Sequence, residues 1–177
     1  MIMICIMLIS LFLVAAYTTA VCIKGHGVPS SISATFYALD HKLWFGATMW
    51  LTAGLLMPAI LEISTENSEW AAFLACVGMM LVGVAPNFRE GIERPIHIAG
   101  AILCLVFSQV WVGFNTPWLL LAWLVYLTPT AILTWRHYQE RKDWRVAFLM
   151  TKPMFWVEVV ALATTYLTIL SHYLGWV

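Results

Sequence analysis

Charge is what this sequence has least of. Only 10% of its 177 residues are Asp, Glu, Lys or Arg, whereas 62% are hydrophobic, and the mean hydropathy is +0.86. A typical soluble domain carries roughly 25% charged residues, which cover much of its exterior. Long stretches of this chain have none, so we expect lipid to be the solvent for much of its surface. The sequence therefore predicts an integral membrane protein.

Several motifs of familiar enzymes are also missing. The chain has no Walker-type phosphate loop, no Gly-x-Ser-x-Gly elbow and no His-Glu-x-x-His. The net formal charge is zero, which gives no argument for nucleic acid as a partner. The four cysteines lie inside apolar runs without metal-type spacing, so we expect them to be small buried hydrophobes. No cofactor is predicted.

Apolar runs of about 20 residues, the length that crosses the hydrocarbon core, recur along the chain. The predicted spans are Met3 to Ile23, Leu43 to Leu61, Trp70 to Pro86, Pro95 to Val112, Trp118 to Trp135 and Pro153 to Trp176. The alternating pattern of a barrel strand is absent. The fold class is therefore all-α, an integral membrane bundle in which residues 1–177 form a single transmembrane helical domain.

Small residues on these spans are expected to allow helices to approach closely. They are Ala47, Ala53, Gly54, Ala75, Gly78, Gly83, Gly100 and Ala101. In the first loop, residues 30–42 are predicted to form a short helix capped by Ser30 or Ser31, with an apolar stripe along the membrane surface. The turn residues 113–117 are predicted to join two spans into a hairpin.

Positive charge is confined to alternate loops. Lys24 and Lys42 lie in the first loop, Arg89 and Arg94 in the third, and the remaining Lys and Arg between Arg136 and Lys152 in the fifth. Because Lys and Arg are retained in the cytoplasm during insertion, we expect these loops to be cytoplasmic and both termini to lie outside, in the periplasm. The predicted location is the cell membrane.

Glu158 is the carboxylate inside a predicted span, where an ionised side chain facing lipid would cost about 3 kcal/mol or more. We expect it to face the bundle interior. His97 lies at similar depth in another span and would meet Glu158 if the two helices pack together. The other predicted ligand-binding residues lie in the first and third loops: Asn87, Ser33, Tyr37, Asp40 and His41. Glu90, Glu93, His137 and Tyr138 are expected on the same membrane face.

Three functions fit this polar concentration. The leading hypothesis is a non-enzymatic bundle that binds or transports a small molecule, lipid or proton through a cytoplasm-facing pocket, with membrane lipids and a second copy of the chain as partners. A metal-dependent lipid hydrolase would use His41, His97 and His137 with Asp40 or Glu158. Intramembrane ceramidase-like hydrolases have such a layout, but their last helices carry a His-x-x-x-His that this sequence lacks. The third hypothesis is a structural or accessory membrane subunit.

Two stretches carry a resemblance. Residues 27–37 read GVPSSISATFY, and Ala85-Pro86-Asn87-Phe88 is followed by His97-Ile98-Ala99-Gly100-Ala101. They resemble uncharacterised small membrane proteins of gut bacteria and their phages. With its six spans and its Pro-Ser-Ile-Ser-like first loop, the chain is also similar to the DRAM-type membrane proteins. That family implies a non-cytoplasmic first loop, opposite to the charge pattern, and no functional residues.

Overall fold

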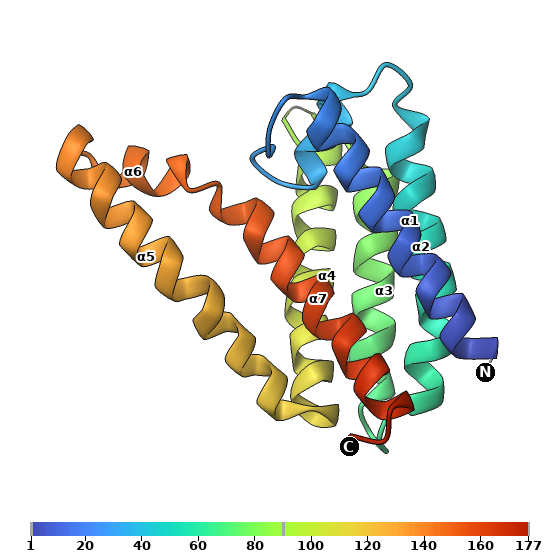
Figure 1. Cartoon of the computed structure of the whole chain (residues 1–177). Helices are drawn as coiled ribbons and strands as arrows, with labels where there is room; N and C mark the ends of the chain where they lie inside the picture. The colour runs from blue at the N-terminus through green and yellow to red at the C-terminus, as the bar shows by residue number, and fades with distance from the viewer. Residues whose placement is uncertain (1, 90, 177) are drawn as a thin grey trace.

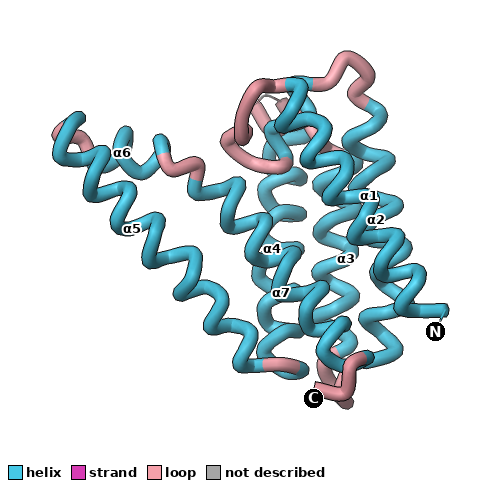
Figure 2. The backbone as a smooth tube through the Cα atoms, in the orientation of Figure 1, coloured by secondary structure: helices cyan, strands magenta, loops and turns pink. Residues whose placement is uncertain are grey.

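The computed structural model describes residues 2–89 and 91–176, and within these residues it contains helices and loops but no strand (Figures 1 and 2). The α-helices are α1 (Ile2–Lys24), α2 (Leu43–Ile63), α3 (Glu69–Val84), α4 (Glu93–Asn115), α5 (Ala122–Arg141), α6 (Trp144–Met150) and α7 (Pro153–Tyr173). Two 3-10 helices are η1 (Ser33–Ala38) and η2 (Pro117–Leu121). The predicted all-α fold is confirmed.

Five helical segments are long and apolar enough to cross a membrane: α1, α2, α4, the continuous η2–α5 segment and α7. The chain is therefore a multi-pass membrane protein. Helix α3 is also apolar but has only 16 residues, which span about 24 Å at 1.5 Å per residue. Because the hydrocarbon core is roughly 30 Å thick, the six predicted spans become five full-length helices and one short one.

The loops differ from the prediction more than the spans do. The predicted helix over residues 30–42 is only η1, because Ser31 Oγ accepts from the Ala34 amide at 2.9 Å and Thr35 Oγ1 donates to the Ile32 carbonyl at 2.6 Å. Such local hydrogen bonds favour turns over a continued helix. The fifth loop contains α6, whose start is capped by Asp143 through the amides of Arg145 and Val146. The sequence analysis missed this helix.

The two termini lie at one end of the bundle, and the α1–α2, α3–α4 and α5–α7 connections lie at the other (Figure 1). This alternation agrees with three antiparallel helix pairs. Helices α1 to α4 and α7 stand side by side, whereas α5 leans away and carries α6 at its tip (Figure 1). The η2 turn follows the predicted hairpin position, where Thr116 hydrogen-bonds to Thr168 of α7 at 2.5 Å.

Gln109 of α4 ties the leaning helix to the bundle. Its amide nitrogen donates to the Ala161 carbonyl of α7 at 3.3 Å, and its amide oxygen accepts from Trp123 of α5 at 2.9 Å and from Thr164 of α7 at 3.1 Å. One polar side chain therefore connects three helices. Hydrogen bonds between helices are a normal means of association in lipid.

Helix α3 packs between α2 and α4 at two glycine contacts. A Cβ at Gly78 would lie 2.4 Å from the Cys104 amide nitrogen, and a Cβ at Gly46 would lie 2.9 Å from the Gly83 carbonyl oxygen. The backbones therefore touch, as small residues permit in membranes. The predicted close contacts of Gly78, Gly83 and Gly100 are confirmed. The prediction for Gly54 was wrong, because a Cβ there would meet nothing within 4 Å.

A matched pair of alanine variants tests the α3–α4 contact. Gly100→Ala should destabilise the protein by about 1–3 kcal/mol, because overpacking forces the backbones apart; the new Cβ would lie 2.8 Å from the Gly78 carbonyl oxygen. Gly54→Ala should be neutral or stabilising by up to about 1 kcal/mol, since alanine is the better helix former. Thermal unfolding in detergent measures both. Equal stability of the two variants would contradict the backbone contact.

Candidate functional site

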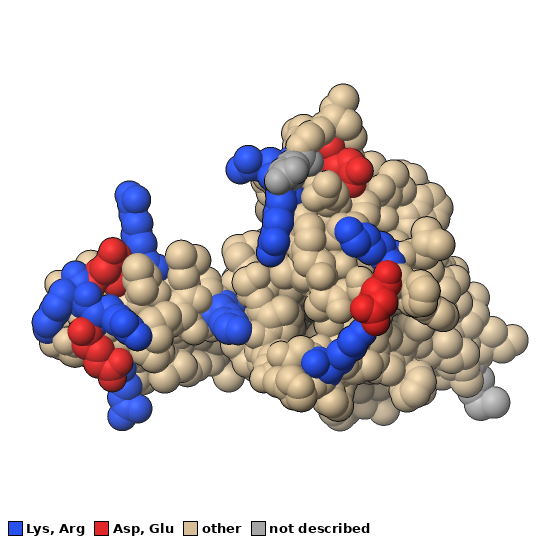
Figure 3. Space-filling view, turned by 90° about the horizontal axis from the view of Figure 1, so that it is seen from above, with Lys and Arg blue, Asp and Glu red and all other residues tan. Residues whose placement is uncertain are grey.

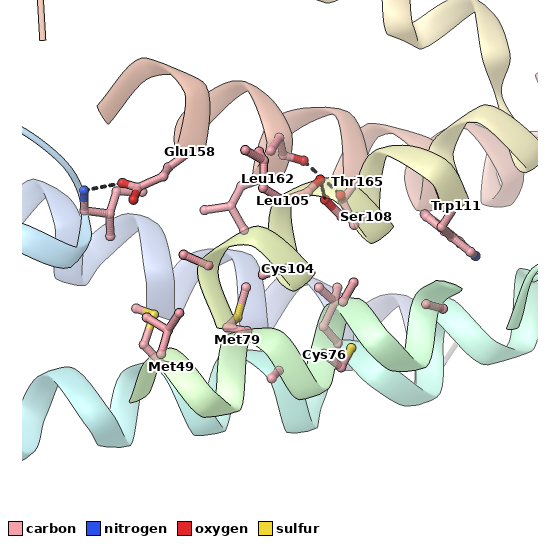
Figure 4. Close-up of a pocket in the computed structure, with 18 of the residues that line it drawn as sticks. Met49, Cys76, Met79, Cys104, Leu105, Ser108, Trp111, Glu158, Leu162 and Thr165 are labelled. Carbon is pink, nitrogen blue, oxygen red and sulfur yellow. Dashed lines mark hydrogen bonds between the residues drawn. The ribbon is translucent and has the colours of Figure 1, made fainter. Parts of the chain in front are cut away.

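A central cavity of about 100 Å³ lies among α2, α3, α4 and α7, with η1 at one end (Figure 4). Its wall consists mainly of alanine, leucine, methionine and cysteine side chains. The two hydroxyl groups of the helical wall are satisfied within their own helices, because Ser108 donates to the Leu105 carbonyl at 3.0 Å and Thr165 to the Ala161 carbonyl at 2.8 Å. The middle of the cavity is therefore chemically apolar.

Glu158 and Trp111 mark the two ends of this cavity (Figure 4). Trp111 has no exposed surface, and its indole nitrogen donates to Ser64 Oγ at 2.8 Å. This hydrogen bond fixes the ring across the end nearer the termini. Within the described part of the chain, Glu158 is the one charged residue that lines the cavity. The prediction that Glu158 faces the bundle interior agrees with this position.

Residues 28–33, which we call the strap, lie along the first turns of α7 and cover the Glu158 end. The Lys152 ammonium donates to the Val28 carbonyl, the Phe155 amide donates to the Ser30 carbonyl at 3.1 Å, and the Ile32 amide donates to the Glu158 carboxylate. The Ser33 amide also faces this carboxylate. The strap is thus held through its own backbone groups.

The start of α7 explains why the strap binds there. Pro153 occupies the first turn, where its missing N–H costs nothing, but the amides that follow have no partner within the helix. The Ser30 carbonyl satisfies the one at Phe155. The amides of Ile32 and Ser33, at the start of η1, also lack a partner within their helix. The Glu158 carboxylate, one turn further along α7, supplies the acceptor. Two helix starts therefore satisfy each other.

His97 is buried but does not meet Glu158. Its Nδ1 lies 2.8 Å from the Ala85 carbonyl oxygen, so Nδ1 carries the hydrogen, and its ring packs on Phe88 at 4.8 Å between centroids. The expected His97–Glu158 pair is not formed, because each side chain satisfies a nearby backbone group instead. His97 also does not line the cavity. It holds the end of α3 against the start of α4.

Tyr37 and Asn87 do come together, as predicted, on the other side of η1. The Tyr37 hydroxyl donates to Asn87 Oδ1 and accepts from the Arg89 amide, both at 3.0 Å, while the Arg89 guanidinium lies 4.1 Å above the Tyr37 ring. Glu93 accepts from the Asn87 amide at 3.0 Å. These contacts tie the first loop to the third. Each of these side chains contacts another protein group, so the cluster holds the two loops together.

The other predicted site residues divide between the cavity and the surface. Ser33 lines the cavity beside Glu158. Asp40 and His41 are partly or fully exposed and do not line the cavity. Asp40 forms an ion pair with Lys24, and the hydrogen bond and charge of that lysine lower the pKa of the carboxyl group. Glu90 lies outside the described residues. The predicted single polar pocket is therefore two separate sites.

The histidines proposed as metal ligands are not brought together. Among the described residues, no group of three His, Cys, Asp or Glu side chains is placed to hold a metal ion. His97 is engaged with Ala85, His41 is exposed at the start of α2, and His137 is half-buried on the leaning helix α5. This arrangement does not support the convergence that the hydrolase hypothesis requires.

The sequence analysis missed most of the cavity. Its wall includes Cys76 and Cys104, which were interpreted as small buried hydrophobes, and Ala101, which was interpreted as a helix contact. Small side chains spaced three or four apart on α3 and α4 could have indicated open space. Nothing in that spacing distinguishes a cavity from close packing, which the Gly78 contact achieves on the same helices.

Two substitutions of Glu158 test its hold on the strap. Glu158→Leu leaves the Ile32 amide without an acceptor, which should cost about 1–3 kcal/mol. Glu158→Gln retains an acceptor oxygen and should cost less. We expect hydrogen–deuterium exchange of the peptide covering residues 28–38 to accelerate in the order wild type, Gln, Leu. Exchange in the Leu variant as slow as in the wild type would show that the strap does not depend on this bond.

Comparisons with protein-family models, with curated proteins and with solved structures find no match to this chain.

Proposed function

We propose that this multi-pass membrane protein binds a small molecule with an apolar body in its central cavity. The observation that carries the proposal is an apolar cavity within the bundle that has one carboxylate, Glu158, at one end and a fixed tryptophan, Trp111, at the other. Binding sites for small molecules are typically apolar with a few polar groups that orient the ligand. Ionisable residues inside membranes most often mark ligand or ion sites.

Binding fits this geometry better than transport or catalysis. The fully buried ring of Trp111 lies at the end nearer the termini, which does not favour a passage through that end. Proton transfer along the cavity would need a series of titratable groups, but beyond Glu158 the lining offers only the thiols of Cys76 and Cys104. A hydrolase would need the Glu158 carboxylate to accept a proton from a nucleophile such as the neighbouring Ser33 hydroxyl, but the hydrogen bond at that carboxylate comes from the backbone amide of Ile32.

A structural role is the second candidate, and a specific contact favours it. Glu158 already holds the strap, and the strap joins the first loop to α7. On this proposal the cavity is a packing void, and the chain stabilises a larger assembly or serves as an accessory subunit. The two candidates differ in whether the cavity ever contains a ligand.

A cavity-filling substitution separates them. Cys104→Phe places a large ring in the cavity, whereas Ile102→Phe, on the same helix α4 but 57% exposed, points away from it. We expect native mass spectrometry of protein extracted from membranes to show the mass of a co-purifying small molecule with the wild type and with Ile102→Phe. Cys104→Phe should lose it.

Melting temperatures of the two variants control for misfolding. If no ligand mass accompanies the wild type, binding in the cavity is wrong. The structural candidate would then be favoured.

We further propose that the end of the bundle with the α1–α2, α3–α4 and α5–α7 connections faces the cytoplasm. All nine Lys and Arg belong to connections or helix ends at this end, where Figure 3 shows them gathered over the bundle and over the tip of α5 and α6. Lys and Arg are retained on the cytoplasmic side. Trp135, Tyr138 and Trp144 cluster at the same tip, with Tyr138 and Trp144 stacked at 4.3 Å. Such aromatic groups suit the membrane interface.

Cysteine labelling in intact cells tests the orientation. With the native cysteines replaced, an impermeant maleimide should label a cysteine at position 69 and leave one at position 141 unlabelled until the membrane is opened. The reverse pattern would instead agree with the non-cytoplasmic first loop that the DRAM-type resemblance implies. Labelling of both positions from outside would contradict the alternation of helices itself.

A further inference from the structure

The leaning hairpin carries the surplus positive charge of the chain. Residues 135–152, which we call the α5–α6 tip, contain five Lys or Arg and two acidic residues, so their formal charge is +3. Because the whole chain sums to zero, the remaining residues carry −3. We infer that the α5–α6 tip binds the head group of an anionic phospholipid. This surface is separate from the central cavity, so either site can fail without the other.

The cations of the tip are not neutralised by acidic side chains. Among the described residues, the one ion pair joins Lys24 to Asp40, outside the tip. Asp143 is the N-cap of α6, where its carboxylate accepts from two backbone amides of the first turn. Glu140 is exposed and forms no ion pair in the described part of the chain. Four exposed cations on α5, on α6 and in the turn between them are therefore available to an anion: Arg136, Arg141, Lys142 and Arg145.

Aromatic side chains indicate the depth of the tip in the membrane. Trp135, Tyr138 and Trp144 pack together with ring centroids 4.3 to 6.0 Å apart, and such rings prefer the membrane interface. Arg141 follows Trp135 by six residues on α5, which is about 9 Å along the helix axis. Because α5 is tilted, the depth between them is smaller (Figure 1). The head-group layer is roughly 5–8 Å thick, so the cations lie at the level of the lipid phosphates.

Helix α6 presents apolar side chains beside these cations. It runs across the direction of the bundle helices, and its Ala147 is fully buried where α6 packs on α5 (Figure 1). A short helix with exposed apolar side chains next to Lys and Arg is typical of one that lies in the membrane interface. The large apolar side chains of α6 are all at least 40% exposed: Trp144, Val146, Phe148, Leu149 and Met150.

An anionic phospholipid matches both parts of this surface. Its phosphate can accept from Lys and Arg, and a guanidinium group can bind two phosphate oxygens at once. Its acyl chains can pack beside the apolar side chains of α6, which a soluble acidic partner would leave uncovered. A zwitterionic lipid has the same phosphate but brings its own cation, which competes with the tip. Clusters of four or more Lys and Arg beside a membrane helix are typical of binding to anionic lipids.

Two photoreactive lipids test the site in the full-length protein. Phosphatidylglycerol and phosphatidylcholine with identical acyl chains, each with a diazirine on the chain near the head group, are added in trace amounts to phosphatidylcholine nanodiscs. We expect phosphatidylglycerol to label the peptides of residues 136–152 about tenfold more than phosphatidylcholine does, and both to label the middle of α1 equally. Sodium chloride at about 1 M, where the Debye length is about 3 Å, should reduce the preference to about twofold or less.

Matched double variants locate the preference. Arg141→Gln/Arg145→Gln removes two cations of the tip and should bring the two lipids within about threefold of each other. Lys42→Gln/Arg94→Gln removes the same charge from exposed positions on the bundle and should keep the tenfold preference. Arg141→Lys/Arg145→Lys retains the charge of the tip and should keep most of the preference. Melting temperatures in detergent show whether each variant is folded.

Three results would overturn the inference. Equal labelling of the wild-type tip by both lipids would mean that these cations do not select anionic lipids, and would favour a soluble acidic partner. Equal losses in the two glutamine variants would show that the preference follows the total charge of the chain instead of the tip. A loss in the lysine variant as large as that in Arg141→Gln/Arg145→Gln would contradict an electrostatic site. None of these results bears on the cavity, which Cys104→Phe tests.

Discussion

In the hydrocarbon of a membrane, backbone N–H and C=O groups have no water to bond to, so the chain must satisfy them itself. Within the spans the helices do this. Threonine and serine hydroxyls are satisfied within the spans as well, because they donate to backbone carbonyls one turn earlier, as Thr164 and Thr168 of α7 do. The difficulty is confined to helix ends, where amides at the start and carbonyls at the end have no partner within the helix. The strap and Glu158 exist where two such starts, those of η1 and α7, lie beside each other.

The same solvent explains why the cavity lies where it does. Lipid tails compete with apolar side chains, so helices gain little by burying leucine and associate through close backbone contacts and polar bonds. Glycine contacts bring α2, α3 and α4 together into one closely packed group. Helix α7 is attached to the bundle by buried side chains such as Ile169 and by polar bonds near its two ends and at Gln109. Between the glycine contacts and these bonds, the small side chains do not fill the space between the helices, and the cavity results.

These forces explain which features the sequence could predict. The spans could be predicted from the length of the apolar runs, and the alternation of the loops from the positions of Lys and Arg. The close glycine contacts could be predicted from residue size. The Gly54 error shows the limit of the last argument, because size permits a contact but the rotation of the helix decides whether a neighbour is there. The His97–Glu158 error has another cause. Two polar side chains at similar depth were expected to pair, but each forms a hydrogen bond with a backbone group instead. The partner of Glu158 is an amide 126 positions away in the chain. No side-chain pattern reports such a bond.

Under the proposed function, the Glu158 carboxylate has two kinds of hydrogen-bond donor, the strap amides and a bound ligand. The strap amides are covalently part of the protein and always nearby, whereas the polar group of the proposed ligand must arrive from outside the bundle. If both donate to the same carboxylate, binding and strap order are coupled, and the coupling is reciprocal: a ligand that weakens the strap is itself bound less tightly when the strap is closed. A polar group that uses only the unfilled acceptor positions of the carboxylate avoids this cost, because it adds a hydrogen bond without displacing one. The proposed ligand and the strap therefore need not compete for Glu158.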